Sequence, residues 1–125
     1  MSELRITTED DRRWFEPGGA VSGEVSWTLT DDADAVELRL FWHTSGKGTE
    51  EAVLVDSVRL ARPPRHGTKS FSFRLPERPY SFSGRLITLQ WALELVVEPS
   101  NEVAGLDLVM GPRPVEVDIS RLREI

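Results

Sequence analysis

The sequence predicts an all-β fold, a sandwich or barrel of short antiparallel strands, and three observations lead to this class. Clusters of Gly, Pro, Asn and Asp break the chain at short intervals, and no helical insert of about 10–15 residues lies between them. The segments between these turns are rich in Val, Leu, Trp, Phe and Thr, which favour strands. Their apolar residues recur at every second position, as in strands with one buried face and one solvated face.

Three segments show the alternation most clearly, and each is predicted to be a strand. They cover residues 21–29, 36–43 and 70–75, and polar side chains occupy the intervening positions of the first and third. In each segment apolar residues occupy alternate positions; they are Val21, Val25, Trp27 and Leu29 in the first, Val36, Leu38, Leu40 and Trp42 in the second, and Phe71, Phe73 and Leu75 in the third. Because side chains of a strand point to alternate faces, these residues are the predicted core.

The segment 51–60 breaks the alternation. Its two early valines share one parity, whereas its late valine and leucine share the other. A β-bulge near Asp56 and Ser57 would bring all four to one face, because a bulge inserts one extra residue. An edge strand is the simplest explanation of this irregularity.

The segment 86–97 fits two templates. A helix would group four of its apolar residues in a stripe, but a strand puts six apolar residues out of six on one face. These six are Ile87, Leu89, Trp91, Leu93, Leu95 and Val97. We therefore predict a strand, which at ~3.3 Å per residue would run about 40 Å and should contain a bend or a bulge. Segments 106–110 and 115–119 are predicted as closing strands.

Composition indicates one globular domain over residues 1–125. The chain is 39% hydrophobic and 29% charged, which is enough apolar material for a core without the signature of disorder. It contains no cysteine, so disulfides, Cys-ligated zinc, iron–sulfur clusters and thiol catalysis are excluded. A domain of this size can fold without disulfides or a structural metal.

Net charge and hydropathy limit the classes of partner and the location that we expect for this protein. With 21 acidic and 15 basic residues the formal net charge is −6, the opposite of what phosphate binding requires, so no nucleic-acid partner is expected. Residues 1–8 lack the apolar stretch of a signal peptide, and no apolar run approaches the ~20 residues needed to span a bilayer. We expect no membrane insertion and a cytoplasmic location.

An acidic turn raises the question of a metal. Asp31, Asp32 and Asp34 lie close together, and a hard cation such as Ca²⁺ requires several loop oxygens. The spacing does not match an EF-hand, so further carboxylates would have to come from another loop. The available donors are Glu50, Glu51 and Asp56. A solvated acidic turn is the main interpretation, and these aspartates are kept as weak metal candidates.

Nothing in the sequence indicates catalysis or a cofactor. The two histidines, His43 and His66, have no partner at metal-ligand spacing, and no nucleophile elbow is present. We expect both to face solvent and the protein not to be an enzyme. Most aromatic residues fall on predicted core faces, but Phe41 lies opposite Trp42 on the outward parity of its strand. Phe41 is therefore a weak candidate for contact with a partner.

Two stretches together resemble arrestin-type domains. Residues 14–25 contain an aromatic residue, a Pro-Gly pair and then Val-x-Gly-x-Val. Residues 71–76 read Phe-x-Phe-x-Leu-Pro, and the segments 79–84 and 89–91 follow as a Tyr-containing turn and Leu-Gln-Trp. The order of these motifs over residues 4–97 is similar to that of the arrestin family.

This resemblance implies an immunoglobulin-like antiparallel β-sandwich of about seven to nine strands that binds other proteins, as receptor adaptors, cargo-sorting scaffolds and bacterial sporulation-control relatives do. Eukaryotic arrestins carry two such sandwiches, and only one fits here, so recognition by paired domains is not carried over and no binding residue is transferred. We expect a non-catalytic scaffold module that uses an exposed sheet edge or a face such as that of Phe41. A second copy of the chain is one candidate partner, and a calcium- or carbohydrate-binding module is the alternative function.

Overall fold

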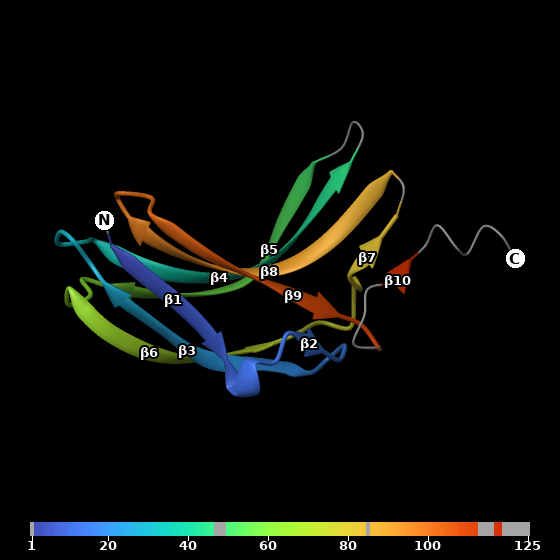
Figure 1. Cartoon of the computed structure of the whole chain (residues 1–125), viewed down its shortest axis with the longest axis horizontal. Coiled ribbons are helices and arrows are strands. Elements are labelled where there is room, and N and C mark those ends of the chain that lie inside the picture. Colours follow the sequence, from blue (N-terminus) through green and yellow to red (C-terminus); the bar gives the residue numbers. More distant parts are fainter. Residues whose placement is uncertain (1, 47–49, 85, 113–116, 119–125) are drawn as a thin grey trace, which may run out of the picture.

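The computed structural model describes residues 2–46, 50–84, 86–112 and 117–118, and it shows two β-sheets packed face to face (Figure 1). The smaller sheet has three antiparallel strands in the order β1 (Glu3–Thr8), β3 (Ala20–Thr28) and β6 (His66–Arg74). Each buries alternate side chains, as expected for strands with one face on a core. The predicted all-β sandwich is confirmed.

The larger sheet contains the four long strands β5 (Glu51–Ala61), β4 (Ala35–Gly46), β8 (Ile87–Glu98) and β9 (Val103–Met110), in that spatial order. All three pairings are antiparallel. β8 lies in the middle and is buried along most of its length. Its alternate positions from Leu89 to Val97 are buried toward the small sheet, and Ala92 and Val96 on its other face are buried as well, as expected for a strand with a neighbour on each side.

Short elements complete the larger sheet. β7 (Phe82–Ser83) pairs with β8, β10 (Val117–Asp118) runs parallel to β7, and β2 (Trp14–Phe15) runs parallel to β9. A 3-10 turn, Glu9–Asp11, links β1 to β2. Among the described residues, no helix is long and apolar enough to cross a membrane.

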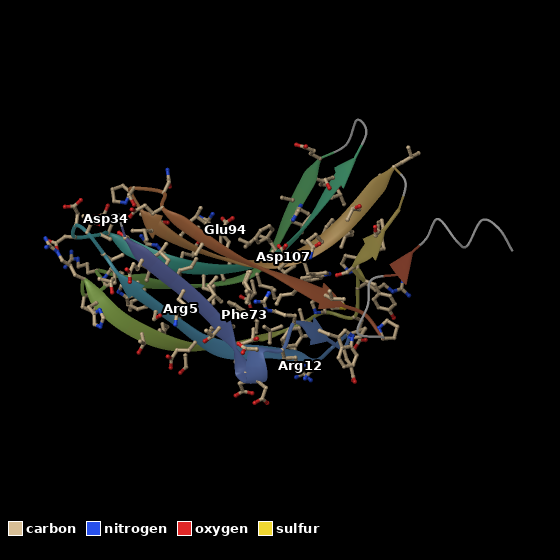
Figure 2. The ribbon with its side chains drawn as sticks, in the orientation of Figure 1. Arg5, Arg12, Asp34, Phe73, Glu94 and Asp107 are labelled. Carbon is tan, nitrogen blue, oxygen red and sulfur yellow. The ribbon has the colours of Figure 1, made fainter. Side chains whose placement is uncertain are left out.

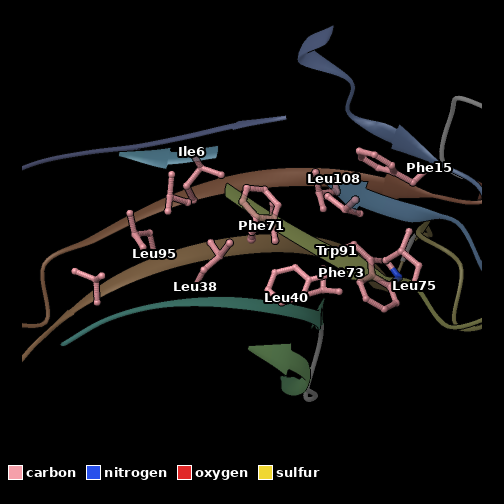
Figure 3. Close-up of a cluster of buried hydrophobic side chains, with 14 of the residues drawn as sticks. Ile6, Phe15, Leu38, Leu40, Phe71, Phe73, Leu75, Trp91, Leu95 and Leu108 are labelled. Atoms are coloured by element: carbon pink, nitrogen blue, oxygen red, sulfur yellow. The ribbon is translucent and has the colours of Figure 1, made fainter. Parts of the chain in front are cut away.

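The hydrophobic core fills the space between the sheets (Figure 3). Trp91 on β8 is fully buried at its centre, and its indole N–H donates to the carbonyl of Pro79 at 2.8 Å. Trp27 on β3 is buried likewise and donates to the carbonyl of Pro64, also at 2.8 Å. Each indole therefore fixes a loop to the core while its polar group stays satisfied.

The long strand predicted at 86–97 is β8, and the structure confirms strand rather than helix. It pairs with β4 from Glu98 opposite Ala35 to Ile87 opposite Gly46. The expected irregularity lies in the neighbouring strand pair, where the β4–β5 register shifts between Leu40 and Phe41. Past that point β4, β5 and β8 rise away from the small sheet, so the long strands are bent (Figure 1).

The bulge in β5 is confirmed close to its predicted place. Asp56 lies opposite Leu40 and Leu54 lies opposite Phe41, so Val55 is the extra residue. The phase change in the sequence is thereby resolved, because Val55, Val58 and Leu60 all pack against the core. β5 is also an edge strand, as its irregular pattern indicated.

Several elements differ from the sequence prediction. β1 was not predicted as a strand, and Phe82 lies in β7 rather than in a loop. The strand predicted at 106–110 begins earlier, at Val103, because β9 runs antiparallel to β8 and pairs with it from Val103 opposite Val96. Of the strand predicted at 115–119, residues 117–118 form β10, and the remainder lies outside the described residues.

Candidate interaction surface

The acidic turn between β3 and β4 does not gather its carboxylates. The Asp32 side chain forms an ion pair with Arg65 at 2.9 Å. Asp34 is held through its backbone, which donates to the carbonyl of Glu98 and accepts from the amide of Arg62. Over the described ranges, no group of three or more His, Asp or Glu side chains is placed to hold a metal ion.

A depression of about 280 Å³ lies beside this turn and is lined by several acids. Most of them already have partners: Glu98 pairs with Arg59 at 2.9 Å, and Glu102 accepts from the backbone N–H of Ser2 at 3.1 Å. The hydrogen bonds from Ser2 lower the pKa of Glu102 below its ordinary value. These carboxylates form ion pairs and hydrogen bonds between the ends of neighbouring strands, so the role of the turn is structural.

The two histidines lie on the surface at separate places. His66 shares a hydrogen bond of 2.9 Å with the Thr28 hydroxyl on the neighbouring strand. His43 lies beside Phe41, with 5.8 Å between the ring centroids. Neither histidine has a nucleophile and a carboxylate arranged around it in the hydrogen bonds of the described residues.

Phe41 lies on the face of the large sheet that points away from the small sheet, here called the outer face. The register places Leu54 of β5, Phe41 of β4, Ala92 of β8 and Asp107 of β9 directly beside one another across four strands. We call these four residues the Phe41 row. Directly paired residues point to the same face of a sheet, so the row presents three apolar side chains that end in a carboxylate.

The exposures within the Phe41 row are graded. Leu54 is 57% exposed, Phe41 is half-buried and Ala92 is only 4% exposed. Asp107 is exposed at the far end of the row. The small Ala92 side chain therefore lies between the larger side chains of Phe41 and Asp107, and we use the word trough for this stretch of the row from Leu54 to Asp107. Partly exposed apolar side chains that lie side by side on a sheet face are candidates for a contact site.

The bulge makes this part of the sheet concave. Because the register shift falls at Phe41, the strands bend there, and the outer face is the inside of the bend (Figure 1). Figure 2 shows Glu94 and Asp107 on the side of β8 and β9 that faces away from β1 and β3. The Phe41 row thus crosses the concave side of the bent sheet.

The next row along the outer face is charged. It contains Arg39 opposite Glu94, and Gly105 on β9 completes it. Arg39 also forms an ion pair with Glu37 on its own strand. The hydrogen bond to Glu37, partly opposed by desolvation, and the nearby negative charges raise the pKa of Arg39 above its ordinary value. One guanidinium thus faces two carboxylates, those of Glu37 and Glu94.

The two sheet edges on the β5–β6 side carry charges that point inward. Asp56 on β5 lies opposite Leu40, and Lys69 on β6 lies opposite Val25, and both of these partners are buried. Paired residues share a face, so each charge points toward the interior at its edge. Inward charges and bulges are the usual devices that stop strands from adding to an edge. Of the two surfaces expected from the sequence, the face is thus better suited to binding than these edges.

On the opposite side the two sheets approach each other through β1 and β9. The backbone N–H of Ser2, just before β1, bonds to Glu102, just before β9, and these two strands lie next to each other. The sequence had indicated Phe41 but neither Leu54 nor Asp107. The signal for these two residues is the cross-strand register, which parity within one strand does not contain.

No family model matches the chain, and no curated protein matches its sequence. Solved structures do resemble it. Spo0M, a sporulation control protein from Bacillus subtilis, superposes with a TM-score of 0.62 at 16% identity, over 90% of this chain and 50% of Spo0M. This chain therefore spans about half the length of Spo0M. The likeness supports the arrestin-type resemblance at the level of the fold.

Two further structures have the same type of sandwich. The CARDB domain of the PF1109 protein from Pyrococcus furiosus, solved with di-metal ions, gives a TM-score of 0.50 at 12% identity, over 90% of this chain and 94% of the domain. A β-glucosidase from Listeria innocua gives 0.50 at 15% identity, over 94% of this chain and only 16% of the enzyme. At these identities the likeness concerns fold alone.

Proposed function

We propose that this protein is a non-catalytic interaction module that binds a partner polypeptide through the outer face of its large sheet. The observation that carries the proposal is the Phe41 row, an apolar trough in a concave, solvent-facing part of the sheet. Apolar side chains that are half-buried before binding need little ordering, so the trough can bury a partner's side chain at small entropic cost.

Two features of the molecule support the face over the edges. The β5 and β6 edges carry inward charges, and β5 is also bulged. The Phe41 row offers one element of a binding hot spot, an aromatic anchor, beside the exposed apolar side chain of Leu54 and a polar rim.

The test uses a phage library of randomised 12-residue peptides, selected for binding to the wild type. Binders are then measured against Leu54→Ser and against Val103→Ser. Val103 is a matched control, because it lies on the same outer face at 54% exposure but two rows away from Phe41, opposite Val96. Loss of the Leu54 contact should weaken binding about tenfold, the effect of ~1.4 kcal/mol of lost apolar burial.

Binding that falls for Leu54→Ser and is unchanged for Val103→Ser supports the face. Peptides that bind all three proteins equally, or a library without any binder, would contradict it. Circular dichroism of each variant checks that the fold is retained, and this is expected because both side chains are more than half exposed.

A further inference from the structure

Resting on this proposed function, we infer that the partner presents a basic residue beside an apolar one: the occupant of the trough is a cationic, apolar polypeptide segment. The inference comes from the charges of the outer face. Four carboxylates and two guanidinium groups lie on the outer face, in the Phe41 row or in the paired rows beyond it; they are Glu37, Glu94, Glu98, Asp107, Arg39 and Arg59. The outer face is therefore acidic at its centre.

The arginines do not neutralise the end of the trough. Arg39 pairs with Glu37 and lies 4.0 Å from Glu94, and Arg59 pairs with Glu98. Asp107 has no ion-pair partner among the described residues. Glu37 and Glu94 thus share one guanidinium, and Asp107, at the end of the apolar row, forms no ion pair within the described part, so this face keeps an excess of two negative charges.

The spacing suits a lysine or arginine of the partner. Neighbouring strands lie about 4.8 Å apart, so Asp107 lies roughly 10 Å from Phe41 and roughly 14 Å from Leu54 across the sheet. A long basic side chain can lay its methylene stem over Ala92 while its charge meets Asp107.

Gly105 leaves room for that charge. It lies in the row next to Asp107, opposite Glu94, and a Cβ placed on it would meet only ordinary contact, 3.8 Å from the carbonyl oxygen of Leu93. With no side chain there, the surface between Asp107 and Glu94 is open. A basic group can therefore approach both carboxylates together, which a single exposed ion pair could not match.

Other occupants fit this surface less well. Nucleic acids and anionic membranes would bring phosphates toward carboxylates on a protein of net charge −6. A second copy bound face to face by a two-fold axis would bring the two acidic faces against each other. A basic, apolar segment of another protein has the complementary charge.

The experiment compares three peptide libraries with the same apolar positions, in which the remaining positions are drawn from Lys and Arg, from Asp and Glu, or from Ser and Gln. Binders are measured against wild type, Asp107→Asn, Leu54→Ser and the control Glu24→Gln. Glu24 is an exposed carboxylate on β3 of the other sheet. We expect binders from the basic library, weakened three- to tenfold by Asp107→Asn and not by Glu24→Gln.

The outcomes separate the two proposals. Leu54-dependent binders that come mainly from the acidic or neutral library, or that ignore Asp107→Asn, would overturn the cationic partner but leave the face intact. Binders that ignore Leu54→Ser, or none at all, would overturn both. Sedimentation velocity tests whether a second copy of this chain occupies the trough. A dimer that is abolished by Leu54→Ser would identify that second copy and overturn the inference.

Discussion

Gly23 shows how a single residue constrains the smaller sheet. It lies on β3 between β1 and β6, opposite Thr8 on one side and Phe71 on the other. A Cβ at this position would overlap the carbonyl oxygen of Thr7 and approach the Cα of Thr8 to 2.8 Å. Both are backbone atoms, which cannot rotate away as a side chain can. Glycine here therefore permits the close approach of β1 to β3.

Gly23→Ala should destabilise the protein by roughly 1–3 kcal/mol, the usual cost of forcing atoms into a packed site. The matched change is Gly105→Ala on β9, where the added Cβ meets open space apart from one ordinary contact. That variant should be neutral or slightly stabilising, because alanine has less freedom in the unfolded chain. Urea denaturation of the two variants checks the difference, and equal destabilisation would contradict the steric explanation.

At the scale of residues, the sequence predicted side chains whose role depends on their own strand. Phe41 was found because it lies on the opposite face of its strand from Trp42. Leu54 and Asp107 were not found. Their importance comes from lying beside Phe41 and Ala92 on other strands, and that register depends on long-range pairing.

At the scale of elements, the edges of the two sheets are the features most exposed to misassociation. β5 and β6 lie on the same side of the sandwich, joined by residues 62–65, and their outer backbone groups have no neighbouring strand in the described structure. Such edges pair with other chains unless something opposes it. Here the opposition comes from Asp56 in the bulged part of β5 and from Lys69 on β6.

Replacing both charges, Asp56→Val with Lys69→Val, should therefore increase self-association relative to the wild type. The control pair is Ser57→Val with Thr68→Val, which adds two valines to the same strands at positions paired with Arg39 and Ser26, on outward faces. Sedimentation velocity over a range of concentrations measures the effect. Similar association of both pairs would show that added apolar surface, not loss of the inward charges, is responsible.

The elements that could be predicted are those whose burial pattern is complete within one segment. β8 was recognised because six alternate positions are apolar, and the β5 bulge because a phase change in an apolar pattern has one simple geometric cause. β1 offers only Leu4 and Ile6 among polar residues, and β7 has two residues. Such strands owe their existence to the sheets they join, which a local pattern does not encode.

At the scale of the whole molecule, the sandwich class was available from the sequence because turn spacing and alternation recur along most of the chain, and the resemblance in fold because its motifs follow one another in order over residues 4–97. The order of strands was not, since β4 pairs with β8 and β3 with β6 over long separations in sequence. The concave outer face follows from that order and from the bulge together. The position of the candidate surface therefore became visible only when the strands were assembled.

Because the net charge is −6, we expect salt to change the free energy of unfolding and the affinity for a basic peptide in opposite directions. The excess of 21 acidic over 15 basic residues repels itself more in the compact state than in the unfolded chain. Raising NaCl from about 0.01 to 0.15 M shortens the Debye length from roughly 30 to 8 Å. The free energy of unfolding in urea should therefore rise modestly, by about 0.2–1 kcal/mol, the scale of a surface charge pair.

Binding of a basic peptide at the Phe41 row should respond in the opposite direction, because salt screens its attraction to Asp107. Asp107→Asn should flatten the salt dependence of binding while leaving that of unfolding nearly unchanged, since it removes one charge of many. Isothermal titration and urea denaturation over the same salt series measure the two slopes. If binding strengthens with salt as folding does, the attraction is apolar alone, and the acidic end of the trough has no part in it.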